Sequence, residues 1–243
     1  MSQRSQPLIS KASKSMFVPG CVEGLEVRAI PLAEATDGHF ELLLSRARQP
    51  LTAPVAQVGH TAARLYYVLN GEIEFDTGER GVQTLIPGDC VYLPAGRVGG
   101  GLYRATDSVL LEFWARQPPA DGLGGEHTVS VVRAAETGYT AHSLRPWLRR
   151  RDLGVAEASR GWLHVGLSVC AQPYPGPAGP HWHSFALHVM MIVQGFCQIE
   201  YAHLGAVTLI PGDCVYQPAG VEHDVVMRSD DCEILEIIAP HPD

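Results

Sequence analysis

Four histidines near the C-terminal end of the sequence have a spacing that could bind a metal ion. His181, His183 and His188 lie close together, and His223 follows after a Pro-Ala-Gly turn. Alternate side chains of an extended strand share one face, so His181 and His183 can act as a two-pronged chelator. After a short turn, His188 can point inward from a neighbouring strand. Imidazole suits Zn, Fe, Ni and Cu, whereas Mg and Ca prefer oxygen ligands.

A buried histidine is more often a hydrogen-bonded core residue than a ligand, and a His-x-His pair occurs by chance. The frame of glycines and prolines around these four favours the metal site. It reads His183-x4-His188-x6-Gly195, followed by Gly212-x5-Pro218-x-Gly220-x2-His223. These two segments resemble the two signature motifs of the cupin superfamily, His-x-His-x(3,4)-Glu-x6-Gly and Gly-x5-Pro-x-Gly-x2-His-x3-Asn.

The chain departs from the family pattern at two positions. His188 stands where the family usually has Glu, and Met227 stands where it has Asn. The resemblance implies a β-barrel that holds one divalent transition metal on His181, His183, His188 and His223. Fe(II) is our first expectation for the metal, with Zn, Ni, Mn and Cu as alternatives.

Composition and charge narrow the classes of partner. The 243 residues carry a formal net charge of −8, and the short basic run Arg149-Arg150-Arg151 is interpreted as a solvated edge. This balance argues against nucleic acids and anionic membranes. No stretch approaches the roughly 18 apolar residues of a membrane span, and the first residues include no apolar signal region. We expect a cytoplasmic protein with a small-molecule substrate and leave open whether it forms a homodimer.

Short apolar runs separated by Gly, Pro and Asp predict an all-β protein. The six cysteines form no C-x-x-C pair and are interpreted as reduced, packed thiols. A stretch rich in Pro and Gly, 117–125, interrupts the pattern and is typical of a linker. We therefore expect four segments: a flexible N-terminal segment 1–15, an N-terminal barrel 16–118, a linker 119–130 and a C-terminal barrel 131–243.

The second half of the chain repeats the first. The octapeptide Leu85–Tyr92 recurs letter for letter as Leu209–Tyr216, and a Pro-Ala-Gly follows at the same distance in each half. Self-similarity at domain length indicates two copies of one fold. The shared Pro-Gly-Asp predicts a tight turn that needs a glycine with positive φ. The fold expected is two tandem antiparallel jelly-roll barrels, the double-stranded β-helix of cupins, which makes the chain a bicupin by resemblance.

Only the second copy carries the full set of histidines. Val58, Arg64 and Gly99 fall opposite His181, His188 and His223, while His60 falls opposite His183. Valine and glycine cannot bind a metal, and a protonated arginine repels a cation. The N-terminal barrel is therefore expected to be metal-free. It is either a structural barrel or a pocket in which Arg64 grips an anion.

The residue types of the site suggest its chemistry. Four neutral imidazoles leave the full charge on a divalent ion, which favours an anionic, oxygen-chelating ligand such as an enolate. Histidine-rich relatives of the cupins include dioxygenases that cleave diketones and zinc-containing polyketide cyclases. A Fe(II) dioxygenase for a small enolic or aromatic carbonyl compound is our first hypothesis. A non-redox Zn or Ni isomerase, cyclase or decarboxylase is the alternative, and a ligand-sensing module without catalysis is a third.

Strand alternation also predicts the wall of the substrate pocket, although the sequence identifies no catalytic residue. Residues near the histidines on the inward face would line it, unless they are simply core. The predicted lining residues are Met190, Ile192, Tyr216, Gln217, Val225 and Met227.

Overall fold

The computed structural model describes residues 6–51, 61–78, 80–116, 127–143 and 145–240. The chain divides into two compact units. The C-terminal unit comprises Met1–Lys14, Gly138–Ala156 and Trp162–Asp243, and the N-terminal unit comprises Ser15–Thr137 and Glu157–Gly161. The pattern of short apolar runs predicted an all-β protein, and the described residues are almost entirely antiparallel β-strands with two one-turn α-helices and one 3-10 turn.

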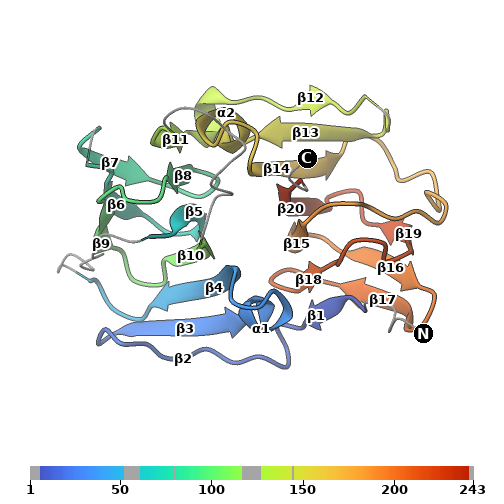
Figure 1. The fold of residues 1–243 in the computed structure, drawn as a ribbon, viewed down its shortest axis with the longest axis horizontal. Coiled ribbons are helices and arrows are strands. Elements are labelled where there is room, and N and C mark those ends of the chain that lie inside the picture. The colour runs from blue at the N-terminus through green and yellow to red at the C-terminus, as the bar shows by residue number, and fades with distance from the viewer. Residues whose placement is uncertain (1–5, 52–60, 79, 117–126, 144, 241–243) are drawn as a thin grey trace. The chain divides into compact units, whose positions relative to one another are not determined.

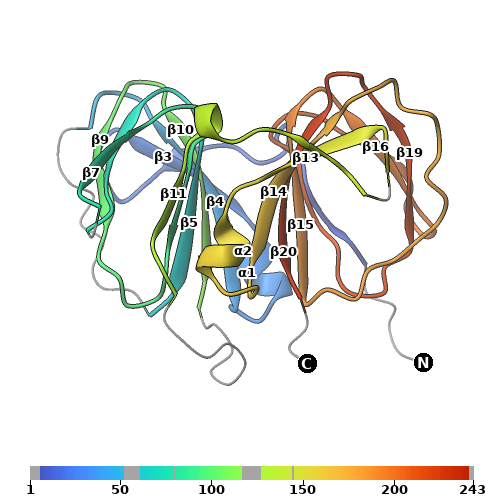
Figure 2. The same cartoon turned by 90° about the horizontal axis from the view of Figure 1, so that it is seen from above.

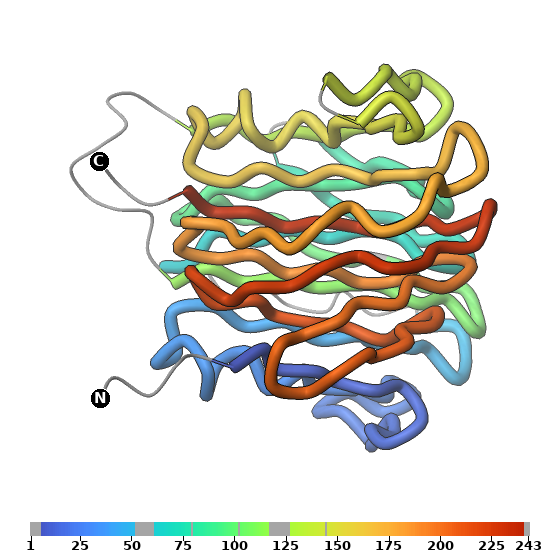
Figure 3. The backbone as a smooth tube through the Cα atoms, turned by 90° about the vertical axis from the view of Figure 1, so that its right-hand side faces the viewer, coloured from blue at the N-terminus to red at the C-terminus, as the bar shows by residue number. Residues whose placement is uncertain are grey.

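The C-terminal unit consists of two facing sheets (Figures 1 and 2). Its seven-stranded sheet has the order β1-β18-β15-β20-β14-β13-β12 and its three-stranded sheet the order β17-β16-β19. The strands, whose antiparallel runs can be followed in Figure 3, are β1 (Leu8–Ser10), β12 (Thr140–Ala141), β13 (Leu148–Asp152), β14 (His164–Cys170), β15 (Leu187–Gln194), β16 (Cys197–Tyr201), β17 (Gly205–Leu209), β18 (Cys214–Tyr216), β19 (His223–Arg228) and β20 (Glu233–Ala239).

The N-terminal unit has the same plan. Its sheets have the orders β11-β8-β5-β10-β4-β3-β2 and β7-β6-β9. The elements are β2 (Val18–Pro19), β3 (Leu25–Ile30), α1 (Leu32–Ala35), β4 (Phe40–Ala47), β5 (Ala63–Asn70), β6 (Ile73–Asp76), β7 (Val82–Leu85), β8 (Cys90–Leu93), β9 (Gly100–Arg104), β10 (Val109–Ala115), β11 (Ser130–Val132) and η1 (Ala134–Glu136), while α2 (Val155–Ala158) contains the boundary with the other unit.

Each unit is a pair of sheets rather than a closed ring of hydrogen-bonded strands, because no pairing between named strands joins its two sheets among the described residues. The apolar residues of the two inner faces pack together. The core of the C-terminal unit includes Met190, Ile199, Val215 and Ile234. No helix in the described ranges is long and apolar enough to span a membrane.

Short strands from distant parts of the chain complete the two large sheets. β1 pairs with β18 of the C-terminal unit, and β11 pairs with β8 of the N-terminal unit (Figure 1). Two of the expected segments differ from the structure. Residues 8–10 of the expected flexible segment 1–15 form a strand of the C-terminal unit, and residues 131–137 of the expected C-terminal barrel 131–243 belong to the N-terminal unit. Most of the predicted linker, 119–126, lies outside the described residues.

The repeated Pro-Gly-Asp forms the predicted turn in both units. Gly88 has φ 91° and Gly212 has φ 84°, both in the left-handed region that glycine adopts readily. The amides of Asp89 and Asp213 donate to the carbonyl three residues earlier, at 2.9 Å in each unit. The prediction of a tight turn at this motif is confirmed.

The aspartate of this turn also fixes the added strand. Asp213 accepts hydrogen bonds from Lys11 Nζ at 2.9 Å and from the amide of Ala12 at 2.7 Å. Asp89 accepts an equivalent pair of hydrogen bonds, from Arg133 Nη1 at 3.0 Å and from the backbone amide of Ala134 at 2.8 Å. Both carboxylates are almost fully buried, so these charge-assisted bonds hold the arm that follows β1 or β11 in place.

Candidate metal centre

Three of the four predicted histidines converge at one end of the C-terminal unit. His181 and His223 are paired through the backbone, each amide donating to the other's carbonyl at 2.9 Å. One ring nitrogen each of His181, His183 and His223 lie within 4.8 Å of one another. Metal–nitrogen bonds of about 2.0–2.1 Å place two ligands at most about 4.2 Å apart. Small side-chain adjustments would therefore let the three rings share one ion.

Backbone carbonyls orient two of these rings. His181 Nδ1 lies 2.9 Å from the carbonyl oxygen of Gly179, and His223 Nδ1 lies 3.0 Å from that of Val221. A carbonyl only accepts, so each Nδ1 carries the proton and each Nε2 carries a lone pair, which in His181 accepts from Arg145. This arrangement suits ligation through Nε2.

His188 lies beside the three but outside their cluster. It projects from β15 with its ring centroid 4.8 Å from that of His183. The side chain is 4 % exposed, and neither ring nitrogen has a hydrogen-bond partner among the described residues. Buried polar atoms are nearly always paired, so these two nitrogens are exceptions that a water or a ligand would have to satisfy.

Burial lowers the pKa of three histidines of the site, His183, His188 and His223. Desolvation, followed by the neighbouring His188, His223 and His181, lowers the pKa of His183 to about 4. Desolvation, followed by His223 and Arg150, lowers the pKa of His188 to about 3. Burial also lowers the pKa of His223, although its hydrogen bond to the Val221 carbonyl counteracts this. At neutral pH these imidazoles are free bases, the form that binds metals.

A carboxylate that the sequence reasoning missed lies beside the histidines. Glu236 projects from β20, and its Oε1 is 4.0 Å from His188 Nε2. Replacement of the usual motif glutamate by His188 suggested a site without a carboxylate. The register places Glu236 opposite Met190, on the inward face that His188 shares. The signal was present, because Glu112 occupies the equivalent position of the first copy.

Two arginines, also missed, bring positive charge to the site. Arg145 Nη2 lies 3.3 Å from His181 Nε2 and donates a hydrogen bond to it, so a metal ion bound at this nitrogen would displace the guanidinium. Arg150 is half-buried on β13, and its side chain covers Gly166, where a Cβ would lie 2.8 Å from Nε. The solvated edge predicted for 149–151 is thus wrong for Arg150, and also for Arg151, which is 5 % exposed and contacts the ring of Tyr139.

The predicted pocket residues divide into core and surface. Met190, Ile192 and Val225 are buried in the apolar core of the C-terminal unit, as their inward direction required. Met227 is 50 % exposed, so its predicted inward position is wrong. A register shift in the β16–β19 pairing, between Gln198 and the next residue, breaks the simple alternation before Met227.

Tyr216 and Gln217 have different surroundings. Tyr216 pairs with Val189, whose side chain points to the face opposite that of His188, so it does not line the site. Gln217 is 3 % exposed. Its backbone amide donates to the His188 carbonyl at 2.8 Å, and its side-chain Nε2 donates to Tyr201 Oη at 2.9 Å. Gln217 is therefore positioned against the strand that carries His188.

The equivalent place in the N-terminal unit is filled by an arginine. Arg64 occupies the position of His188, is 1 % exposed, and donates to the carbonyls of Gly99 at 3.4 Å and Arg97 at 2.8 Å. These contacts favour a structural role over the predicted alternative of gripping an anion. Val58 and His60 lie outside the described residues.

Comparison with known proteins shows what kind of fold this is. No protein-family model matches the chain, and no curated protein matches it in sequence. Among solved structures, protein YlbA from E. coli is 15 % identical, with a TM-score of 0.72 over 98 % of this chain and 92 % of its own. This is a likeness of fold alone.

Two further structures show the same relationship. A variant of Bacillus subtilis oxalate decarboxylase is 14 % identical, with a TM-score of 0.68 over 97 % of this chain and 78 % of its own. Vicilin from Corylus avellana (hazelnut) is 14 % identical, with a TM-score of 0.62 over 96 % of this chain and 85 % of its own. Proteins with different names share this fold, so function must be argued from the site.

Proposed function

We propose that the C-terminal unit is a metal-dependent enzyme site for a small, anionic, oxygen-chelating substrate. The observation that carries this proposal is the convergence of ring nitrogens from His181, His183 and His223 within 4.8 Å. These three would hold one divalent transition metal, with His188 as the candidate for a fourth ligand. In this proposal the two units are the two cupin barrels of a bicupin, and only one of them is catalytic.

The metal would supply positive charge to polarise a bound oxygen and, in the case of Fe(II), reactivity towards O2. The chain's own residues have other tasks. Arg145, 3.3 Å from His181 Nε2, would bind the substrate's negative charge beside the metal, because an anion between them relieves the repulsion of two cations. The buried Met190 and Ile192 would exclude water from the apolar side of the substrate.

The first reaction we propose is Fe(II)-dependent oxidative cleavage of a C–C bond in a small enolic or aromatic carbonyl compound. Neutral histidine ligands and a nearby arginine support it, because both favour an enolate that chelates through two oxygens. The substrate would bind bidentately and lose its proton on binding.

A second candidate is a metal-dependent reaction without oxygen, such as isomerisation, cyclisation or decarboxylation on Zn, Ni or Mn. Glu236 favours it, since a carboxylate 4.0 Å from His188 Nε2 can accept or return a proton at the substrate. The fold likeness to oxalate decarboxylase is compatible with this candidate but does not decide it.

One experiment separates the two. Protein produced without a chelating tag is stripped of metal and reloaded with Fe(II), Mn(II) or Zn(II), and then given β-diketones, α-hydroxy ketones and small dicarboxylic acids. Oxygen uptake with Fe(II) alone would support the dioxygenase, whereas turnover under argon would support the second reaction. His183→Ala should abolish either activity, and His203→Ala, at an exposed histidine of the same unit, should not. Turnover by His183→Ala would contradict the proposal.

A further inference from the structure

We propose that the interior of the N-terminal unit is a second ligand site, independent of the histidines, for a small neutral aromatic alcohol. The unit contains a cavity of about 390 Å³ that is partly open to solvent. Ligand pockets occupy about 300–1,000 Å³, whereas packed interiors leave few voids larger than a water molecule. A cavity of this size is therefore large enough to hold an organic molecule.

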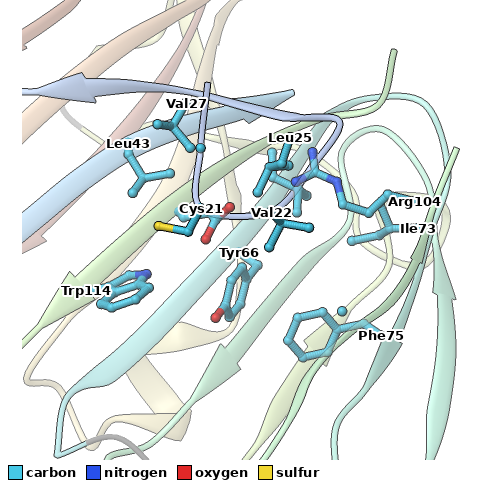
Figure 4. A pocket seen from close by; sticks show the side chains of 14 residues that line it. Cys21, Val22, Leu25, Val27, Leu43, Tyr66, Ile73, Phe75, Arg104 and Trp114 are labelled. Carbon is cyan, nitrogen blue, oxygen red and sulfur yellow. The ribbon is translucent and has the colours of Figure 1, made fainter. Parts of the chain in front are cut away.

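Aromatic rings form part of the cavity wall. Tyr66, Phe75 and Trp114 line it, and Figure 4 shows the ring of Tyr66 between those of Trp114 and Phe75. The ring centroids of Tyr66 and Phe75 are 4.8 Å apart with planes tilted by 52°. Leu43 and Leu110 complete an apolar lining on the strand side. Flat aromatic molecules gain most from such a wall, because rings prefer offset or edge-to-face contacts.

Two charged groups give the cavity its polar end. Arg104 Nη1 donates to Ser45 Oγ at 2.7 Å, Arg104 Nη2 donates to the carbonyls of Ser45 and Ser108 at 3.0 Å each, and Ser45 Oγ donates to Glu112 Oε1. Arg104 and Glu112 both line the cavity. Desolvation raises the pKa of Glu112 and lowers the pKa of Arg104, so burial disfavours charge at this end of the cavity, and a charged ligand would be buried at a cost. A hydroxyl group, by contrast, can donate to the Glu112 carboxyl group.

The cavity reaches solvent at a turn. The segment Gly20–Leu25 closes on itself, since the amide of Gly20 donates to the Leu25 carbonyl at 2.7 Å. Figure 4 shows Cys21 and Val22 on the loop that crosses the cavity. Cys21 is exposed and also lines the cavity, so its thiol lies at the mouth. A ligand inside should shield this thiol from reagents.

The aromatic wall is specific to this unit. Strand registers place Met190, Ile199 and Ile238 of the C-terminal unit at the positions of Tyr66, Phe75 and Trp114. These aliphatic residues lack the flat faces that bind an aromatic ring. The two units are thus specialised for different ligands, and the second site needs neither the metal nor the activity proposed above.

The test uses the full-length protein in the presence of a metal chelator, with 1-naphthol, naphthalene and 1-naphthoate as probes. We expect 1-naphthol to bind once per chain by calorimetry and to slow modification of Cys21 at least ten-fold. Naphthalene, which lacks the hydroxyl, and the anion 1-naphthoate should bind at least ten-fold more weakly. Cys21→Ser identifies the fast-reacting thiol.

Two cavity-filling variants locate the binding. Leu43→Phe fills the cavity from β4, and Val22→Phe fills it from the covering turn. The turn variant keeps the test valid if Leu43→Phe misfolds, because a surface turn tolerates a larger side chain better than the core does. Each should weaken 1-naphthol binding at least ten-fold, while Val98→Phe, at an exposed position of the same unit, should not. No binding by the parent protein, equal binding by the filled variants, or tighter binding of 1-naphthoate would overturn the proposal.

Discussion

Two equivalent positions, Arg64 in the N-terminal unit and His188 in the C-terminal unit, differ in what satisfies their polar atoms. The guanidinium of Arg64 donates to the carbonyls of Gly99 and Arg97. Both nitrogens of His188 are buried without a partner in the described residues. The N-terminal unit therefore satisfies this position with its own backbone, whereas in the C-terminal unit the two nitrogens of His188 make no hydrogen bond to the described residues.

A second comparison concerns polar residues that both interiors contain. The strand registers of the two units make three pairs of positions equivalent. They are Ser45 and Ser168, Arg104 and Arg228, and Glu112 and Glu236. In the N-terminal unit the three residues are joined by hydrogen bonds. In the C-terminal unit Ser168 Oγ and two nitrogens of Arg228 have no partner within the described ranges, and Glu236 lies near His188. The same residue types thus form a structural network in one unit and border the candidate site in the other.

The largest expected effect is a difference in unfolding free energy between substitutions at Arg64 and at His188. Arg64→Leu removes the donors to the buried Gly99 carbonyl and the part-buried Arg97 carbonyl and should cost about 3–5 kcal/mol of unfolding free energy. His188→Leu removes an imidazole without partners, so metal-free protein should change by less than about 1 kcal/mol. Urea unfolding in the presence of a chelator measures both. Equal losses would break the comparison.

Acid should destabilise the two units differently. The pKa of His188 is about 3 in the folded, metal-free protein and about 6.5 when unfolded, so the unfolded state takes up the proton first. The contribution of His188 to the free energy of unfolding is therefore fully present above about pH 7 and is lost as the pH drops below 6.5. The loss from this residue reaches about 2 kcal/mol at pH 5. Hydrogen exchange at pH 7.5 and pH 5, corrected for intrinsic rates, should show the loss in the C-terminal unit. His188→Leu should reduce it, and an unchanged loss would contradict the assignment.

A smaller difference is expected between the two serines. Ser45 Oγ accepts from Arg104 and donates to Glu112, so Ser45→Ala should cost about 1–3 kcal/mol. Ser168→Ala removes a hydroxyl without a partner and should be neutral within about 0.5 kcal/mol. Thermal unfolding of the two variants side by side measures the difference. A large loss for Ser168→Ala would show that its hydroxyl has a partner after all.

Local sequence patterns predicted much of this arrangement. The repeated octapeptide indicated a duplication, and the two units indeed share one strand order. Turn chemistry predicted the glycines with positive φ, because few other residues adopt that backbone conformation easily. The His-x-His spacing and the later His223 predicted side chains that converge, and they do, although His183 lies outside the strands and His181 pairs only through an isolated bridge with His223.

The remaining features depend on long-range pairing. β1 pairs with β18 and β11 pairs with β8, and each pair joins segments far apart in the chain. Nothing in the sequence of either short strand specifies its partner. The outward position of Met227 follows from a shift of register that alternation cannot predict. Arg145 reaches His181 from a loop with no motif of its own. Glu236 lies on a strand without a motif of its own, and only the pairing of β20 with β15 brings it beside His188.

Metal content per chain tests the central claim, that ring nitrogens of His181, His183 and His223 hold one ion, most directly. Tag-free protein is loaded with Zn(II) or Fe(II), freed of excess metal and analysed by mass spectrometry. We predict one ion per chain in the parent protein and in His203→Ala, and occupancy near zero in His183→Ala and His223→Ala. Full occupancy in both of the latter variants, or a second ion held by the N-terminal unit, would contradict the account.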